Sequence, residues 1–220
     1  MASTVKVESF SNNDPEAPIQ GYFHLPDQPS GDGIVLTHGA GSNCNSPLIV
    51  ALAESFAESG MMVLRCDLPF RVSRSQGPPP RASAERDQQG LRSAVEAVRQ
   101  RVAGRVFLGG HSYGGRQASI LAASEPKLAD ALLLLSYPLH PPTKPLELRT
   151  KHFPELQTAA LFVHGTRDGF GTIEELTSAI KLIPARTELM RVENSGHELI
   201  NPKNRASLPG EIIKKFAEFA

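Results

Sequence analysis

The 220-residue sequence contains little that would direct the chain to a membrane, a metal ion or a nucleic acid. No apolar run approaches the roughly 20 residues that span a bilayer, and the N-terminus lacks the apolar segment of a signal peptide. Lysine plus arginine number 23, as do aspartate plus glutamate, so no net charge favours nucleic acid or an anionic membrane surface. The only cysteines, Cys44 and Cys66, have no partner at a metal-ligand spacing and are expected to be free thiols. These absences favour a cytoplasmic protein.

Apolar, β-rich runs alternate with stretches of helical periodicity along the whole chain. Strands are expected at residues 4–10, 18–25, 33–37, 61–65, 106–108, 131–136, 160–163 and 188–192, and helices at 47–59, 83–101, 116–123, 173–182 and 212–219. Such alternation predicts a mostly parallel sheet with helices on both faces. No repeat or linker interrupts it, so we expect one domain over residues 1–220, folded as a three-layer α/β/α sandwich.

Two proline-rich segments break the alternation, at residues 71–87 and 138–154. Both follow strand ends on the side where ligands bind in parallel sheets. The second segment is too short and contains too many prolines to form a helical lid domain. We therefore expect both segments to be ordered loops around a shallow, open site.

The sequence Gly110-His111-Ser112-Tyr113-Gly114 directly follows a strand-like run. Glycines two residues on either side of a serine allow a turn tight enough to present its hydroxyl above the strand end. A helix-compatible stretch follows, as that turn requires. The pattern predicts that Ser112 is a nucleophile.

A serine hydroxyl needs a histidine base, and the histidine needs an acid that orients it. In a sheet of this kind the expected chain order is serine, acid, histidine. The first acid in the polar turn after strand 160–163 is Asp168, and the only histidine beyond it is His197. Glu193 and Glu174 remain as alternative acids.

An oxyanion formed during acyl transfer requires two N–H donors. One is expected from Tyr113, the residue after the nucleophile, and the other from the glycine-rich turn His38-Gly39-Ala40-Gly41 after strand 33–37. Ala40 is the expected donor and Gly39 the alternative. A phosphate-binding role does not fit this turn, because no Gly-Lys-Ser/Thr follows it.

Together these motifs resemble the α/β-hydrolase superfamily from about residue 18 to the C-terminus, and most closely its small, cap-less, dienelactone-hydrolase-like members. The stretch from His38-Gly39-Ala40-Gly41 to residue 71 is similar to a hydrolase-like family that also has animal relatives. Dienelactone hydrolases use a cysteine nucleophile, whereas this chain carries Ser112. The resemblance implies the α/β-hydrolase fold without a sizeable lid.

The expected activity is a serine hydrolase acting on a small ester, thioester or related acyl compound, with no metal and no cofactor. Arg71 and Tyr137 are candidate substrate contacts, and Arg74 and Arg81 share the basic segment with Arg71. An arginine here would recognise a negatively charged substrate group. The contrasting hypothesis is an idle hydrolase fold that serves as a binding or scaffold module. The sequence does not indicate the oligomeric state.

Overall fold

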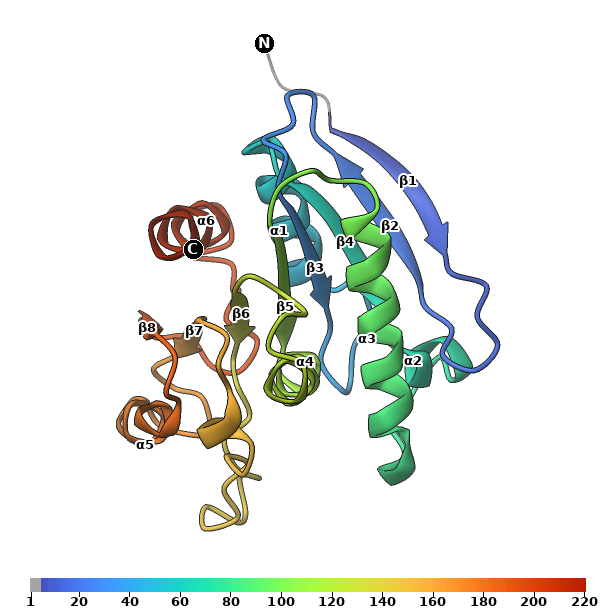
Figure 1. The fold of residues 1–220 in the computed structure, drawn as a ribbon. Helices are drawn as coiled ribbons and strands as arrows, with labels where there is room; N and C mark the ends of the chain where they lie inside the picture. Colours follow the sequence, from blue (N-terminus) through green and yellow to red (C-terminus); the bar gives the residue numbers. More distant parts are fainter. Residues whose placement is uncertain (1–4) are drawn as a thin grey trace.

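A computed structural model describes residues 5–220, apart from the side chain of Arg81. The described residues form one sheet of eight strands in the order β1-β2-β4-β3-β5-β6-β7-β8 (Figure 1). β2 pairs antiparallel with β1 and with β4, and all other pairs are parallel. The strands are β1 Lys6–Ser11, β2 Gln20–Leu25, β3 Gly33–Thr37, β4 Met62–Asp67, β5 Val106–His111, β6 Leu132–Leu135, β7 Ala160–Gly165 and β8 Thr187–Val192.

Helices cover both faces of the sheet (Figure 1). One face carries α1 Pro47–Glu58 and α6 Leu208–Phe219, and the other carries α2 Pro69–Ser73, α3 Ala84–Arg99, α4 Tyr113–Ser124 and α5 Ile173–Ala179. Short 3₁₀ turns lie at η1 Arg81–Ser83, η2 Phe153–Glu155 and η3 Ile180–Leu182. This arrangement confirms the predicted α/β/α sandwich.

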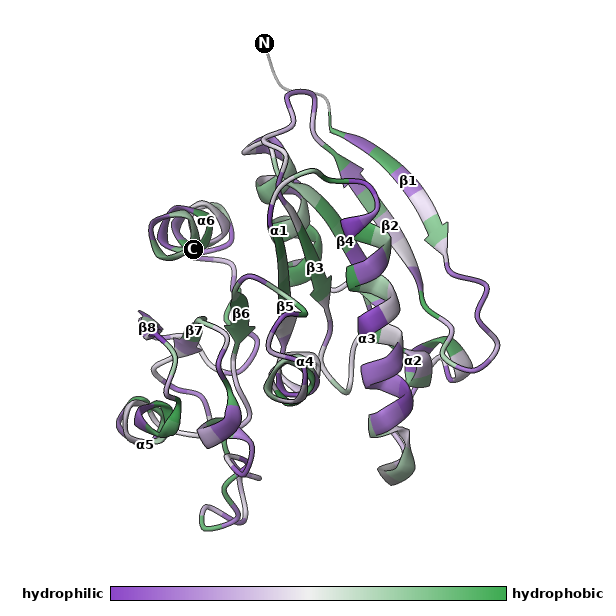
Figure 2. Ribbon diagram, in the orientation of Figure 1, coloured by the Kyte–Doolittle hydropathy of each residue, from purple (hydrophilic) through white to green (hydrophobic). Residues whose placement is uncertain are grey.

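The hydrophobic core consists of two layers, one on each side of the sheet. Every residue of β3, β5, β6 and β7 is buried, as expected for parallel strands covered on both faces. Figure 2 shows these central strands as apolar, whereas α3 presents a largely polar surface to solvent. The rigid sheet thereby holds the loops at the carboxyl ends of its strands.

The first proline-rich segment differs from the prediction of a loop. Residues 69–73 form α2, and η1 leads directly into α3, which already contains Asp87. α2 has only five residues and therefore shows no periodicity that sequence analysis could detect. Near the N-terminus, strand β1 begins at Lys6, and residue 4 of the predicted strand lies outside the described residues.

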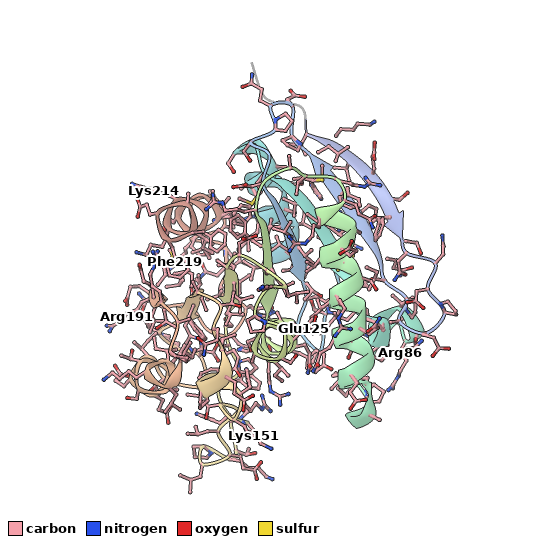
Figure 3. The ribbon with its side chains drawn as sticks, viewed as in Figure 1. Arg86, Glu125, Lys151, Arg191, Lys214 and Phe219 are labelled. Carbon is pink, nitrogen blue, oxygen red and sulfur yellow. The ribbon has the colours of Figure 1, made fainter. Side chains whose placement is uncertain are left out.

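The second segment, residues 138–154, contains no α-helix and no strand, and η2 begins at Phe153. Lys151 projects from this segment at the edge of the molecule (Figure 3). The part of the chain that the structure describes therefore has no lid domain, as predicted from the length and proline content of the segment.

Candidate active site

Ser112 lies in a sharp turn between β5 and α4. Its backbone has φ 51° and ψ −114°, a conformation that a non-glycine residue adopts only when its surroundings impose it. A Cβ atom on Gly110 would lie 2.5 Å from the Gly115 nitrogen, and one on Gly114 would lie 2.6 Å from the His38 carbonyl oxygen. The two glycines therefore let strand, helix and the neighbouring loop approach closely enough to form the turn.

The structure brings Ser112, His197 and Asp168 together. The Ser112 hydroxyl lies 2.8 Å from His197 Nε2, and His197 Nδ1 lies 2.8 Å and 3.0 Å from the two carboxylate oxygens of Asp168. A carboxylate only accepts hydrogen bonds, so Nδ1 carries the proton and Nε2 is free to accept the hydroxyl proton. The three residues come from the ends of β5, β7 and β8, far apart in the sequence.

Asp168 is buried and is the only acid hydrogen-bonded to His197 among the described residues. The Phe170 N–H donates a further hydrogen bond of 2.8 Å to its carboxylate. Burial alone would raise the pKa of Asp168, but the hydrogen bond and charge of His197 and the Phe170 N–H lower the pKa below its ordinary value. The alternatives Glu193 and Glu174 are both exposed.

Two aromatic rings enclose His197. The centroid of the Phe170 ring lies 4.2 Å from that of the His197 imidazole, and the centroid of the His111 ring lies 5.2 Å from it. His111 Nε2 donates to the His197 carbonyl oxygen at 2.8 Å, which anchors the loop carrying His197 to the turn carrying Ser112. Burial lowers the pKa of His111, which favours the neutral ring.

The glycine-rich turn after β3 holds its peptide groups in defined directions. His38 Nδ1 donates to the Gly39 carbonyl oxygen at 2.8 Å, while His38 Nε2 accepts from the Leu68 N–H at 3.2 Å. The Gly114 N–H donates to the His38 carbonyl oxygen at 3.2 Å. In a trans peptide the N–H points opposite to the preceding carbonyl. The Gly39 N–H therefore points away from the Gly114 nitrogen.

Tyr113 is the first residue of α4, so its N–H has no acceptor within the helix. Its phenol donates a 2.6 Å hydrogen bond to Asp87, which is fully buried in α3. Burial raises the pKa of the Asp87 carboxyl, and the hydrogen bond from Tyr113 opposes this increase. Sequence analysis did not identify Asp87, because nothing local marks it as buried.

The structure contradicts the prediction that Arg71 contacts substrate. Arg71 is 5% exposed, and its guanidinium donates to four backbone carbonyl oxygens of the protein itself. Four of its five N–H donors are thus occupied. Arg74 is exposed, and the side chain of Arg81 lies outside the described part of the chain.

Tyr137 is likewise a core residue and not a substrate contact. Its side chain is fully buried and packs against the rings of Phe153 and Phe162 at centroid distances of 5.3 Å and 5.9 Å. Its hydroxyl donates to the Arg149 carbonyl oxygen at 2.6 Å. The phenol therefore fastens the second proline-rich segment to the sheet.

An open hollow of about 860 Å³ lies beside His197 and is lined by Arg167 and by residues 193, 194 and 196–204, but not by Ser112. A second hollow of about 600 Å³ lies between the same loop and α1, and shares Ile200, Asn201 and Pro202 with the first.

Within residues 5–220, no cluster of three or more His, Cys, Asp or Glu side chains is placed to hold a metal ion. None of the helices in that range has the length and apolar character needed to cross a bilayer.

Comparison with known proteins gives one family and many similar folds. Residues 31–219 match the family model described as an alpha/beta hydrolase domain. A dienelactone hydrolase from Anabaena variabilis has a TM-score of 0.77 and 19% identity, with 98% of each chain covered. Est1E from Butyrivibrio proteoclasticus has a TM-score of 0.75 and 16% identity, covering 96% of this chain and 98% of that one. XC6422 from Xanthomonas campestris, a serine hydrolase without a lid, has a TM-score of 0.75 and 17% identity, covering 97% of this chain and 94% of that one.

At these identities the solved structures establish a shared fold, and they do so over nearly the whole chain. The family match extends over all but the first 30 residues and the last one. The resemblance to lid-less, dienelactone-hydrolase-like proteins is thereby confirmed. The chain belongs to the alpha/beta hydrolase family.

Proposed function

We propose that this protein is a serine hydrolase that cleaves small esters, thioesters or related acyl compounds. The observation that supports this most strongly is the continuous hydrogen-bonded chain from Ser112 through His197 to Asp168. Such a chain supplies a nucleophile, a general base and an acid that fixes the tautomer of the base.

In the acylation step the Ser112 oxygen attacks the substrate carbonyl carbon, and its proton moves to His197 Nε2. The carbonyl oxygen becomes an oxyanion, which the N–H groups of Ala40 and Tyr113 stabilise. When the tetrahedral intermediate collapses, the leaving alcohol or thiol takes the proton from His197, and the acyl group stays on Ser112.

In the deacylation step a water molecule gives a proton to His197 as its oxygen attacks the acyl carbon. Collapse of the second intermediate returns that proton to Ser112 and releases the carboxylic acid. Asp168 stays ionised in both steps, because its pKa is already lowered by His197. Its charge stabilises the imidazolium that each step forms.

The nucleophile is tested with p-nitrophenyl esters and a fluorophosphonate probe. Ser112→Ala should lose on the order of 10³-fold or more in kcat and should not be labelled, with an unchanged melting temperature. Ser136→Ala is the matched control, since Ser136 is another buried serine just after the neighbouring strand β6. It should keep both activity and labelling.

The alternative is a binding module with an idle site. If the wild-type protein hydrolyses none of the esters and is not labelled by the probe, the hydrolase proposal is wrong and this alternative holds. A wild-type protein labelled at a residue other than Ser112 would refute the nucleophile assignment alone.

A further inference from the structure

The buried guanidinium of Arg71 connects two segments that are distant in the sequence. Nη2 donates to the Ala40 carbonyl oxygen at 2.8 Å and Nε donates to that of Ser42 at 2.8 Å. On the other side, Nη1 donates to the Arg74 carbonyl oxygen at 3.1 Å and Nη2 to that of Gly77 at 2.9 Å. One side chain thus holds the glycine-rich turn after β3 against the segment that follows α2.

The charge of Arg71 is compensated without an acid. None of the ion pairs formed by residues 5–220 includes Arg71, and its guanidinium lies 4.9 Å from the centroid of the Phe70 ring. Four carbonyl dipoles and one aromatic face therefore surround it. A planar fork of five donors can satisfy such a set, whereas the single nitrogen of a lysine cannot.

The two peptide groups on either side of the Ala40 Cα are both held by hydrogen bonds. His38 Nδ1 holds the carbonyl of Gly39, and Arg71 holds the carbonyl of Ala40. The Ala40 N–H belongs to the first of these planar groups, so fixing both planes fixes the direction of that N–H. Without Arg71, the second plane loses its hydrogen bond at the Ala40 carbonyl oxygen, and the turn keeps the hydrogen bond of 3.2 Å from the Ser42 N–H to the Gly39 carbonyl oxygen.

The helix that carries Arg71 is attached to the other oxyanion donor as well. Asp87 accepts from the Phe70 N–H at 2.9 Å and from the Tyr113 hydroxyl at 2.6 Å. Arg86, labelled in Figure 3, adds a 3.3 Å hydrogen bond from α3 to the Ser73 hydroxyl. The side of the site formed by Ala40 and the side formed by Tyr113 are therefore both connected to α2.

We propose that Arg71 is a positioning residue: it holds the Ala40 turn so that the Ala40 N–H is directed at the oxyanion. This inference rests on the proposed hydrolase function and names a residue that acts on the reaction without contacting substrate. It predicts a different phenotype from substrate recognition. Loss of Arg71 should slow turnover of every ester to the same degree, whatever charge the ester carries.

The kinetic test compares Arg71→Ala and Arg71→Lys with wild type on a neutral ester and on an isosteric ester that carries a carboxylate. Removal of an oxyanion donor costs about 10²–10³-fold in kcat, so an indirect effect should reach roughly 10–10²-fold in Arg71→Ala, with little change in KM. Arg71→Lys keeps the charge and part of the hydrogen bonding and should lose less. Arg74→Ala is the matched control, because it removes an exposed arginine of the same segment, and it should match wild type.

Two further measurements separate positioning from general destabilisation. A trifluoromethyl ketone forms a hemiketal oxyanion on the serine, so its affinity should fall by the same factor as kcat. Guanidinium, added well below denaturing concentrations, should restore part of the activity of Arg71→Ala. If Arg71→Ala does not fold, the kinetics and the ketone affinity are measured on Arg71→Lys only.

The effect of Arg71 on the order of the Ala40 turn can also be measured without catalysis, as the rate of amide hydrogen exchange at residues 40–43. Exchange there should be faster in Arg71→Lys than in wild type, and unchanged in Ser112→Ala. Unchanged exchange, kcat and ketone affinity in a folded Arg71→Lys would overturn the inference, as would a loss confined to KM for the acidic ester. If Ser112→Ala abolishes activity but the Arg71 variants keep wild-type activity, only this inference is wrong. If the wild-type protein is inactive and unlabelled, both the hydrolase proposal and the role of Arg71 in catalysis are wrong.

Discussion

At the scale of single residues, Asp168 illustrates how one buried carboxylate can control a neighbouring ring. Its two oxygens face His197 Nδ1, and the Phe170 N–H fixes the carboxylate plane. In Asp168→Asn the amide can present a donor to Nδ1, which favours the wrong tautomer of the imidazole. We expect kcat to fall by about 10³–10⁴-fold with little change in KM and in the melting temperature.

Glu193→Gln is the control for this substitution. Glu193 lies four residues before His197, and its side chain is exposed and has no hydrogen bond to the imidazole. Steady-state kinetics on a p-nitrophenyl ester should therefore give wild-type values for Glu193→Gln. A larger loss in Glu193→Gln than in Asp168→Asn would show that the wrong acid has been assigned.

The residues that sequence analysis expected to meet, and that the structure brings within hydrogen-bond distance, are those with a local signature. Ser112 has glycines at fixed spacing, and Asp168 and His197 follow strand ends in the expected order. Arg71 and Tyr137 were interpreted wrongly because both follow strand ends but have their polar atoms satisfied by distant backbone carbonyls. A pattern of residue types does not reveal which carbonyl groups converge on a side chain.

At the scale of elements, α2 depends on close packing against α3. A Cβ atom on Gly90 of α3 would lie 2.6 Å from two ring carbons of Pro69, the first residue of α2. Alanine is favoured over glycine in a helix by about 1 kcal/mol, but overpacking costs about 1–3 kcal/mol. Gly90→Ala should therefore lower the free energy of unfolding and, by displacing α2 and Arg71, also reduce kcat.

The matched control is Gly210→Ala in α6, where an added Cβ meets nothing within 4 Å. Urea denaturation should show that this variant is more stable than wild type by about 0.5–1 kcal/mol, through helix propensity alone. Its kcat should stay unchanged. If Gly90→Ala were stabilised as much as Gly210→Ala, the close packing of α2 against Gly90 would contribute nothing to stability.

The alternation of strands and helices made most elements predictable, because each has the length at which periodicity appears. α2 is the exception. Its five residues are stabilised by Asp87, which accepts the Phe70 N–H in the way that a helix-capping side chain does. That side chain comes from the middle of another element, so the start of α2 is set by tertiary structure.

At the scale of the whole molecule, buried neutral histidines make stability depend on pH. Burial, followed by the charge of Arg65, lowers the pKa of His24 from 6.5 to about 4. Arg65 Nε donates to His24 Nε2 at 2.8 Å, a bond that a protonated ring cannot accept. Between pH 6.5 and about 4 the unfolded chain binds a proton at His24 that the folded chain does not. Acidification in this window therefore favours unfolding, by up to about 1.4 kcal/mol per pH unit.

Urea denaturation across this window measures the effect. The free energy of unfolding should decrease as the pH falls toward about 4, and His24 should add no further loss below that value. His24→Gln keeps an acceptor for Arg65 but does not titrate, so its stability should decrease less steeply with acidification. Parallel curves for wild type and His24→Gln would refute the assignment of His24 as an acid-sensitive group.

The open form of the site also predicts the size of the acyl group that is hydrolysed. Residues 138–154 contain no α-helix and no strand, and they form no lid domain. A long acyl chain would therefore leave most of its apolar surface in water and gain little binding energy at about 25 cal/mol per Å² of buried area. We expect kcat/KM to be highest for acetyl or butyryl esters and to show no increase when the substrate forms micelles. Faster hydrolysis of a long-chain ester, or activation at a lipid–water interface, would show that residues 138–154 close over the substrate as a lid does.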